Sequence, residues 1–300
     1  MKKYVPFLMV CVGSISYGIP ASLVKLSELE KNQLNILIMV MLLFSSIILT
    51  LFSNLFERKK GYDSRLEASK KSKMTFFVSG FSIFGTNYFY MNSLSYISVS
   101  VAAVLLMQSI WITSLLHFFF KKERPTKSLI IQTLLILIGT ILATNIIQDH
   151  KLSFTGILLG IASAICYSFT LYFTGNSSEK ISPINKAKLM IYGAFSLSLI
   201  ALINTNNIFQ NIFYISFFGG VIAIFSVFIP LLSFTLFMPK VSGGLGPLIS
   251  SFELPSAIFF SYVLLGEEVD ILQIIGILII IFTISYSSIN TVVRSEKAMS

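Results

Sequence analysis

The amino-acid sequence predicts an all-α integral membrane protein with ten transmembrane helices in two inverted five-helix repeats. Three observations predict this fold: the composition, the spacing of the apolar segments, and a repeat between the two halves of the chain. Of the 300 residues, 55% are hydrophobic and 12% are charged, and the mean hydropathy is +0.83. A soluble domain is about one quarter charged. Too few polar side chains are therefore present to cover a water-soluble surface.

The apolar segments have the length that a membrane span requires. A helix needs roughly 20 apolar residues to cross the hydrocarbon layer, because its backbone hydrogen bonds must all be made within the segment. The first segment follows Lys2 and Lys3, and we expect a retained helix there rather than a cleaved signal peptide. Charges and turn residues predict helices near 4–24, 33–56, 74–92, 98–120, 128–147, 153–174, 188–204, 211–237, 242–265 and 271–291.

The basic residues predict the orientation of the chain. With the N-terminus in the cytoplasm, 19 of the 22 lysines and arginines lie on the cytoplasmic side and 3 lie outside. This asymmetry is the positive-inside pattern, and an odd number of spans would destroy it. We therefore expect a multi-pass protein of the cytoplasmic (cell) membrane with both termini in the cytoplasm. The net charge of +9 then reflects topology rather than a nucleic-acid partner, and the lipid bilayer is the expected surroundings.

The two halves of the chain resemble each other. A shift of 144 residues places Ile97 and Ser98 on Val241 and Ser242, and a shift of 150 residues places 15–17 on 165–167. The expected units are an N-terminal five-helix repeat, 1–148, and a C-terminal one, 149–300. Because five is odd, the halves enter the membrane in opposite directions. Such repeats allow a central cavity to open alternately to each side.

Glu253 is the leading candidate for a functional residue. Of the 13 acidic residues, it alone lies well inside an expected span, about halfway along 242–265. A charge at this depth costs about 2.5–3.5 kcal/mol on insertion scales unless it faces protein or water. Small residues recur along its helix at steps of three or four and predict a close-packed or cavity-lining face around the carboxyl group. This stripe comprises Gly243, Gly246, Ser250, Glu253, Ala257 and Ser261. Two prolines in the same helix, Pro247 and Pro255, predict either a kink or a discontinuous helix.

The internal repeat suggests what faces Glu253. The shift of 144 residues makes Ser109 its counterpart, on a matching stripe with Ser98, Ala102 and Thr113. We predict a substrate-binding set that also includes polar and aromatic neighbours, although each aromatic also fits a packing role. The predicted set is Glu253, Gln108, Ser109, Trp111, Thr113, Ser250, Asn87, Tyr90, Tyr17 and Tyr167.

Several stretches in order resemble the drug/metabolite transporter superfamily, in particular its EamA-type branch, over nearly the whole chain. They are Ser16-Tyr17-Gly18 followed by Lys25, the run 88–106, Lys122-Glu123-Arg124, Leu265-Gly266-Glu267-Glu268, and the glycines Gly139 and Gly276. The sequence departs from the family pattern in two places: 36–50 carries no basic residue, and Gln108 and Trp111 stand where proline is frequent. The resemblance implies a ten-helix transporter of small metabolites.

The sequence thus favours a secondary transporter, and an exporter in particular, that works by alternating access. A lone intramembrane carboxyl group suits amino acids or amphiphilic and cationic compounds, and Glu253 is the expected proton-coupling residue. An enzyme is not expected, because the sequence holds no H-E-x-x-H or G-x-S-x-G motif. No metal or other cofactor is predicted either, since His117 and His150 have no second histidine at ligand spacing. A non-transporting membrane sensor or partner protein remains the alternative.

Overall fold

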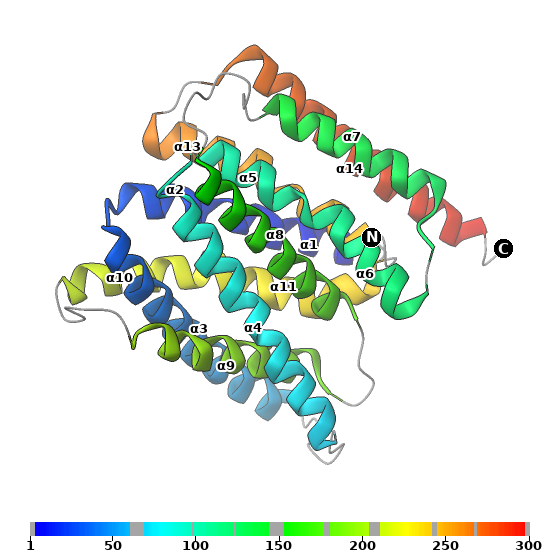
Figure 1. The fold of residues 1–300 in the computed structure, drawn as a ribbon. Helices are drawn as coiled ribbons and strands as arrows, with labels where there is room; N and C mark the ends of the chain where they lie inside the picture. Colours follow the sequence, from blue (N-terminus) through cyan, green and yellow to red (C-terminus); the bar gives the residue numbers. More distant parts are fainter. Residues whose placement is uncertain are drawn as a thin grey trace.

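The computed structural model describes residues 4–60, 69–97, 99–122, 124–143, 153–176, 181–203, 211–241, 245–266 and 269–297. All regular secondary structure in these ranges is helical (Figure 1). The helices of the first half are α1 (Val5–Tyr17), α2 (Ile19–Leu26), α3 (Lys31–Lys60), α4 (Lys70–Ser93), α5 (Val99–Met107), α6 (Ser109–Lys121) and α7 (Lys127–Ala143).

The second half begins with α8 (Phe154–Gly175) and α9 (Pro183–Ala201). A long rod follows, made of α10 (Ile212–Ile222), a π-helical segment (Ala223–Phe228), α11 (Ile229–Phe237) and a short 3₁₀ turn (Met238–Lys240). The chain then continues through α12 (Leu245–Ser250), α13 (Glu253–Leu265) and α14 (Ile271–Lys297). The last residue of the predicted helix 188–204 and the first three residues of the predicted helix 242–265 lie outside the described residues.

Six helical segments of the described chain are long and apolar enough to cross a membrane. They are Val5–Leu26, Gln33–Leu55, Val101–Lys121, Phe154–Gly175, Ile212–Lys240 and Leu245–Leu265. Two shorter apolar helices are Lys127–Ala143 and Ile271–Tyr286. The apolar side chains on their outer faces, such as Phe213 and Phe282, are exposed, as expected of surfaces that face lipid.

Several predicted boundaries are wrong by more than a turn, including the end of α14, which is Lys297 rather than 291. The helix expected to begin at 188 begins at Pro183, because Ser182 caps it by accepting a hydrogen bond from the Asn185 N–H at 3.2 Å. Two lysines in this segment suggested a loop at the membrane surface. The first of them is buried inside the helix bundle, as described below.

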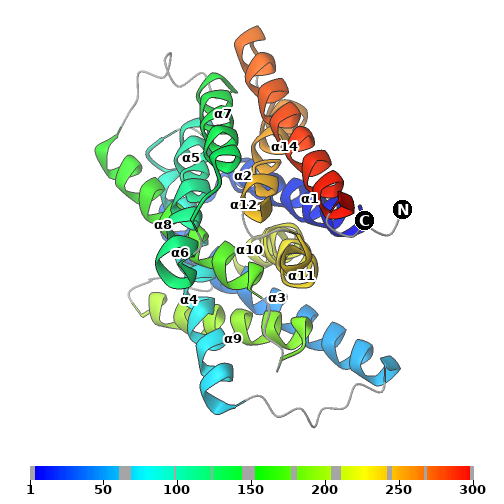
Figure 2. The ribbon, with the colours of Figure 1, turned by 90° about the vertical axis from the view of Figure 1, so that its right-hand side faces the viewer.

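Helices from the two halves pack in matching pairs. The contact between α4 and α8 has a counterpart between α11 and α1, in which the halves exchange roles. The contact of α4 with α9 matches that of α10 with α3 in the same way, and the contact of α6 with α8 matches that of α13 with α2. Figures 1 and 2 show α7 and α14 together along one side of the molecule, and α3 and α9 at the opposite side.

Glycines bring several of these pairs into backbone contact. A Cβ atom at Gly80 in α4 would lie 1.8 Å from the Met190 carbonyl oxygen in α9, and one at Gly193 would lie 1.8 Å from the Phe77 carbonyl oxygen. In the outer pair, a Cβ at Gly276 would lie 2.4 Å from the Gly139 carbonyl oxygen. Small residues at helix crossings allow such close approach in membrane proteins. The glycines therefore set the spacing between the two halves.

Candidate functional site

Glu253 lies at a break in its helix. Ser251 and Phe252 form a turn between α12 and α13, and their backbone N–H groups donate to Leu248 and Ile249 carbonyls at 3.1 Å each, in the tighter pattern of a 3₁₀ turn. Pro255 has no N–H and so cannot continue an α-helical bond to Ser251. The expected discontinuity is thus present. It places Glu253, 4% exposed, at the first position of α13.

Tyrosines from three other helices surround this carboxyl group. Tyr17, at the end of α1, stacks on Tyr167 of α8 with ring centroids 5.3 Å apart and planes inclined by 15°. Both hydroxyl groups, and that of Tyr90 in α4, lie within electrostatic range of the Glu253 carboxyl. Four of the predicted residues are therefore brought together around one buried point.

Polar atoms at this point are left without hydrogen-bond partners. Glu253 Oε2 and Ser251 Oγ are buried and have no hydrogen-bond partner among the described residues, whereas the Tyr167 hydroxyl lies close enough to interact with the Glu253 carboxyl group. In α6, Ser109 Oγ is also buried without a partner among the described residues. An unsatisfied buried group costs about 1–3 kcal/mol, and native structures contain few of them. These groups are therefore unusual among the buried polar atoms of the described residues.

Interruptions in other helices lie against the region around Glu253. A Cβ at Gly18, between α1 and α2, would lie 2.6 Å from the Ala257 backbone nitrogen in α13, so the break in α1 presses directly on α13. Ser256 fastens the contact by donating to the Ile15 carbonyl at 2.6 Å. Ser16 in turn donates to the Phe225 carbonyl, within the π-helical segment, at 2.9 Å. π-Helical segments occur frequently at functional sites.

A small cavity lies beside the tyrosine pair. Its volume is about 20 Å³, and its polar lining comes from Tyr17, Thr86, Tyr167, Thr170 and Ser226. This volume is enough for roughly one water molecule, whereas sites for small organic ligands are about 300–1,000 Å³. The helices are thus closed around the site in this conformation.

Sequence analysis missed Thr86, Thr170 and Ser226 as cavity residues. Thr86 and Thr170 lie among other polar residues, such as Ser82 and Ser168, and Ser226 is a hydroxyl within an apolar run, so none of the three carries a distinctive pattern. Pro230, which also lines the cavity, is a detectable signal, because proline inside a long apolar segment marks a change in helix geometry.

The remaining predicted residues fall at varied distances from this centre. Ser109 is the first residue of α6 and is fully buried, and Thr113 donates to the Ser109 carbonyl at 2.7 Å. Ser250 is also buried and donates to the Pro247 carbonyl at 2.6 Å. Along the predicted stripe, 246, 250, 253, 257 and 261 are all buried, and Gly243 lies outside the described residues.

Three predicted residues make other contacts. Trp111 is 41% exposed, and its indole N–H donates to Gln108 Oε1 at 2.9 Å, so this pair belongs to the surface of α6 rather than to the buried centre. Asn87 is buried in α4 and accepts a hydrogen bond from Ser226 at 3.1 Å, which ties it to the π-helical segment.

Comparison with known proteins identifies the family. A match to the EamA-like transporter family covers residues 5–145 and again residues 154–289. The chain belongs to the EamA-like transporter family. No curated protein is similar enough to give a significant match. The fold is that of known structures: one crystal structure of another protein aligns with a TM-score of 0.73 at 14% sequence identity, over 95% of this chain and 96% of the other.

Membership of the EamA-like family establishes the general class of the protein. It is a multi-pass membrane transporter of the drug/metabolite type, and members of the family are transporters rather than enzymes. The match in two successive regions also accounts for the similarity between the halves of the sequence.

One basic residue of this EamA-like chain was assigned wrongly. Sequence analysis placed Lys186 in a cytoplasmic segment before the helix 188–204, whereas it lies within α9 and is 2% exposed. Its ammonium group donates to the Thr174 and Asn176 carbonyls at 3.0 and 2.6 Å, and lies 5.3 Å from the centre of the Phe76 ring. A lysine at this place satisfies carbonyls at the C-terminal end of α8. Lys186 lies in the first turn of α9, and burial lowers its pKa to about 7, helped by repulsion from Lys121.

Proposed function

We propose that this protein is a secondary exporter of small metabolites that works by alternating access and is coupled to protons. In this proposal the chain crosses the cytoplasmic membrane ten times, with both termini in the cytoplasm and with units 1–148 and 149–300 inverted relative to each other. The distribution of lysine and arginine supports the orientation. The exchange of roles between the halves in the contacts of α4, α8, α11 and α1 supports the inversion.

The observation that carries the proposal is the unpartnered carboxyl oxygen of Glu253 at a helix break. A broken helix offers free backbone groups to a substrate in the middle of a membrane. The stacked rings of Tyr17 and Tyr167 provide a flat aromatic surface beside the acid. An acid next to aromatic faces suits a positively charged or zwitterionic amino group, which both the carboxylate and the ring faces attract. The proposed substrates are therefore amino acids or amphiphilic and cationic compounds.

Transport requires the helices around the site to separate, since the cavity of about 20 Å³ is too small for such a substrate. The turn at 251–252 and the break at Gly18 are the proposed places for the movement, because regular α-helix is interrupted at both. An ionised carboxylate is costly in a site closed to water. Binding a proton at Glu253 removes that cost, so the site closes more easily when it holds either a proton or a cationic substrate.

The proposal can be tested in proteoliposomes that contain a pH-sensitive dye. A panel of amino acids and organic cations is added outside, and proton flux and substrate uptake are measured together. We expect one class of compound to drive proton movement through the wild-type protein and not through Glu253→Gln. Glu30→Gln is the matched control, because it makes the same change at an exposed acid before α3. The panel is chosen by comparing metabolites retained and released by cells with and without the protein.

Three results would count against the proposal. If vesicles with the wild-type protein transport none of the compounds in the panel, a sensor or partner protein is favoured. Proton-linked flux that survives in Glu253→Gln would remove this residue from the coupling mechanism. Equal losses in Glu253→Gln and Glu30→Gln would show a general effect of charge instead of a specific site.

A further inference from the structure

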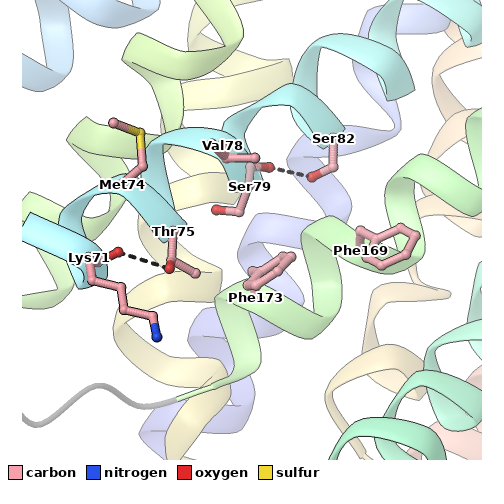
Figure 3. Close-up of a pocket in the computed structure, with 8 residues that line it drawn as sticks. All are labelled: Lys71, Met74, Thr75, Val78, Ser79, Ser82, Phe169 and Phe173. Atoms are coloured by element: carbon pink, nitrogen blue, oxygen red, sulfur yellow. Dashed lines mark hydrogen bonds between the residues drawn. The ribbon is translucent and has the colours of Figure 1, made fainter.

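A groove runs along the outer surface between α4 and α8, away from the tyrosine cluster. Its volume is about 550 Å³, within the range of sites that hold small organic molecules. Figure 3 shows Lys71 at one end of the groove and Ser82 farther along the same helix, while Phe169 and Phe173 come from α8. The groove is open along its length to the side of the molecule where membrane lipid lies in the proposed topology.

The wall of the groove offers little hydrogen bonding to an occupant. Thr75 donates to the Lys71 carbonyl at 3.0 Å, and Ser79 donates to the Phe76 carbonyl at 2.8 Å. The hydroxyl group of Ser82 bonds the Ser79 carbonyl at 2.7 Å and Thr170 Oγ1 at 2.8 Å. These hydroxyls are therefore engaged within the protein. What remains is an apolar surface, which suits a hydrocarbon chain better than a polar metabolite.

The length of the groove corresponds to one leaflet of a bilayer. From Lys71 to Ser82 the helix rises about 16 Å at 1.5 Å per residue. The hydrocarbon core of a bilayer is about 30 Å thick, so the groove extends roughly halfway through it. Lys71 then lies at the headgroup level, just before the expected span 74–92. A chain of this depth, anchored at the surface, has the shape of one acyl tail of a phospholipid.

The charge at the open end selects the headgroup. Of the exposed lysines Lys70, Lys71 and Lys73 in this helical turn, Lys71 is the one that lines the groove. A lysine near the membrane surface attracts anionic headgroups. We propose that this groove binds an anionic phospholipid, with one acyl chain along α4 and α8 and the phosphate group on Lys71. The inference depends on α4 crossing the membrane in the proposed topology, and it is independent of the role of Glu253.

The test measures lipid binding to the purified full-length protein. The protein is delipidated in detergent and titrated with palmitoyl-oleoyl phosphatidylglycerol or with phosphatidylcholine of the same chains, and native mass spectrometry counts the bound lipids. We expect tighter binding of phosphatidylglycerol. Lys71→Gln should weaken it roughly fivefold, which is the effect of one lysine at an anionic surface, and should leave phosphatidylcholine binding unchanged. Lys70→Gln is the control, because Lys70 has the same charge but does not line the groove.

A second pair of variants tests the groove itself. Val78 lines the groove and is 47% exposed, whereas Val12 on α1 is 48% exposed and lies elsewhere. Val78→Phe should fill part of the groove and weaken both lipids, and Val12→Phe should weaken neither. Equal wild-type affinity for the two lipids would overturn the proposal. So would equal losses in Lys71→Gln and Lys70→Gln, or wild-type binding by Val78→Phe. Because the readout is bound lipid, a failure here is distinct from a failure of transport.

Discussion

The backbone contact between α4 and α9 predicts an unusually large effect for a very small substitution. A Cβ atom does not approach closer than 3.0 Å to such a neighbour, yet at Gly80 it would lie 1.8 Å from a carbonyl oxygen of the facing backbone. The backbone cannot rotate away as a side chain does, so Gly80→Ala must force the helices apart by about 1 Å and open the packing beside them. Overpacking of this kind costs about 1–3 kcal/mol, against a gain of about 0.5–1 kcal/mol from helix propensity.

The same reasoning applies to Gly193, which contacts α4 in return. Because one separation of the helices relieves both contacts, Gly80→Ala with Gly193→Ala should cost less than the two single changes added together. The assay is the thermal unfolding midpoint of purified protein in detergent, followed by size-exclusion chromatography after heating.

The control for this experiment is Gly220→Ala in α10. A Cβ there would have its nearest neighbour, the Phe44 ring, at 3.9 Å, which is ordinary contact. This variant should be as stable as the parent or more stable, since alanine favours helix. The reasoning is refuted if Gly80→Ala is as harmless as Gly220→Ala, or if the effects of the two interface variants simply add.

Three further predictions follow from the buried polar groups. Glu253→Leu should raise the unfolding midpoint while stopping transport, because it removes an unpartnered buried oxygen worth about 1–3 kcal/mol; a lower midpoint would mean that the carboxyl group is well satisfied. Lys186 has a pKa of about 7 in the folded protein against an ordinary value of 10.5, so the unfolded chain holds the proton more tightly. The free-energy cost of burying the charged ammonium group of Lys186 is complete below pH 7, and it is relieved as the pH rises toward 10. The midpoint of the parent should therefore rise over this window relative to that of Lys186→Met, and parallel pH profiles would contradict the assignment. Ser256→Ala should lower stability by about 1 kcal/mol by removing the hydrogen bond to Ile15. An unchanged denaturation midpoint would show that this bond contributes nothing.

The helical architecture was predictable because membrane spans carry a strong one-dimensional signal. The prediction failed where contacts between helices, rather than the local sequence, determine the structure. A lysine in the sequence usually indicates the protein surface. Lys186 nevertheless lies inside the helix bundle, because the end of α8 provides carbonyl groups that accept its hydrogen bonds. The break between α12 and α13 was signalled by Pro255. The break at Gln108 has no proline to announce it, and it is visible only in the tight bond from its N–H to the Leu105 carbonyl at 3.1 Å.

The candidate site was predictable in its centre and not at its edges. The burial of Glu253 followed from a lone acid in an apolar run. The repeat made Tyr17 and Tyr167 equivalent positions, but the stacking of their rings on each other was not predicted. The exposure of Trp111 could not be foreseen, because the sequence does not show whether an aromatic residue in a membrane helix faces lipid or protein. The roles of all these residues in binding stay predictions. The π-helical segment needed the structure, since its sequence resembles any apolar helix.

The helices α6 and α13 each contain 13 residues, and each ends at a residue in left-handed conformation, Lys122 and Gly266. They begin 144 residues apart, at Ser109 and Glu253. In the proposed alternating access, each of these helices would come to occupy a place that in the other half already holds a helix of the same length. Their first positions differ, with a hydroxyl in one and the carboxyl group of Glu253 in the other. We therefore expect neutralisation of this acid to shift the balance between the two arrangements.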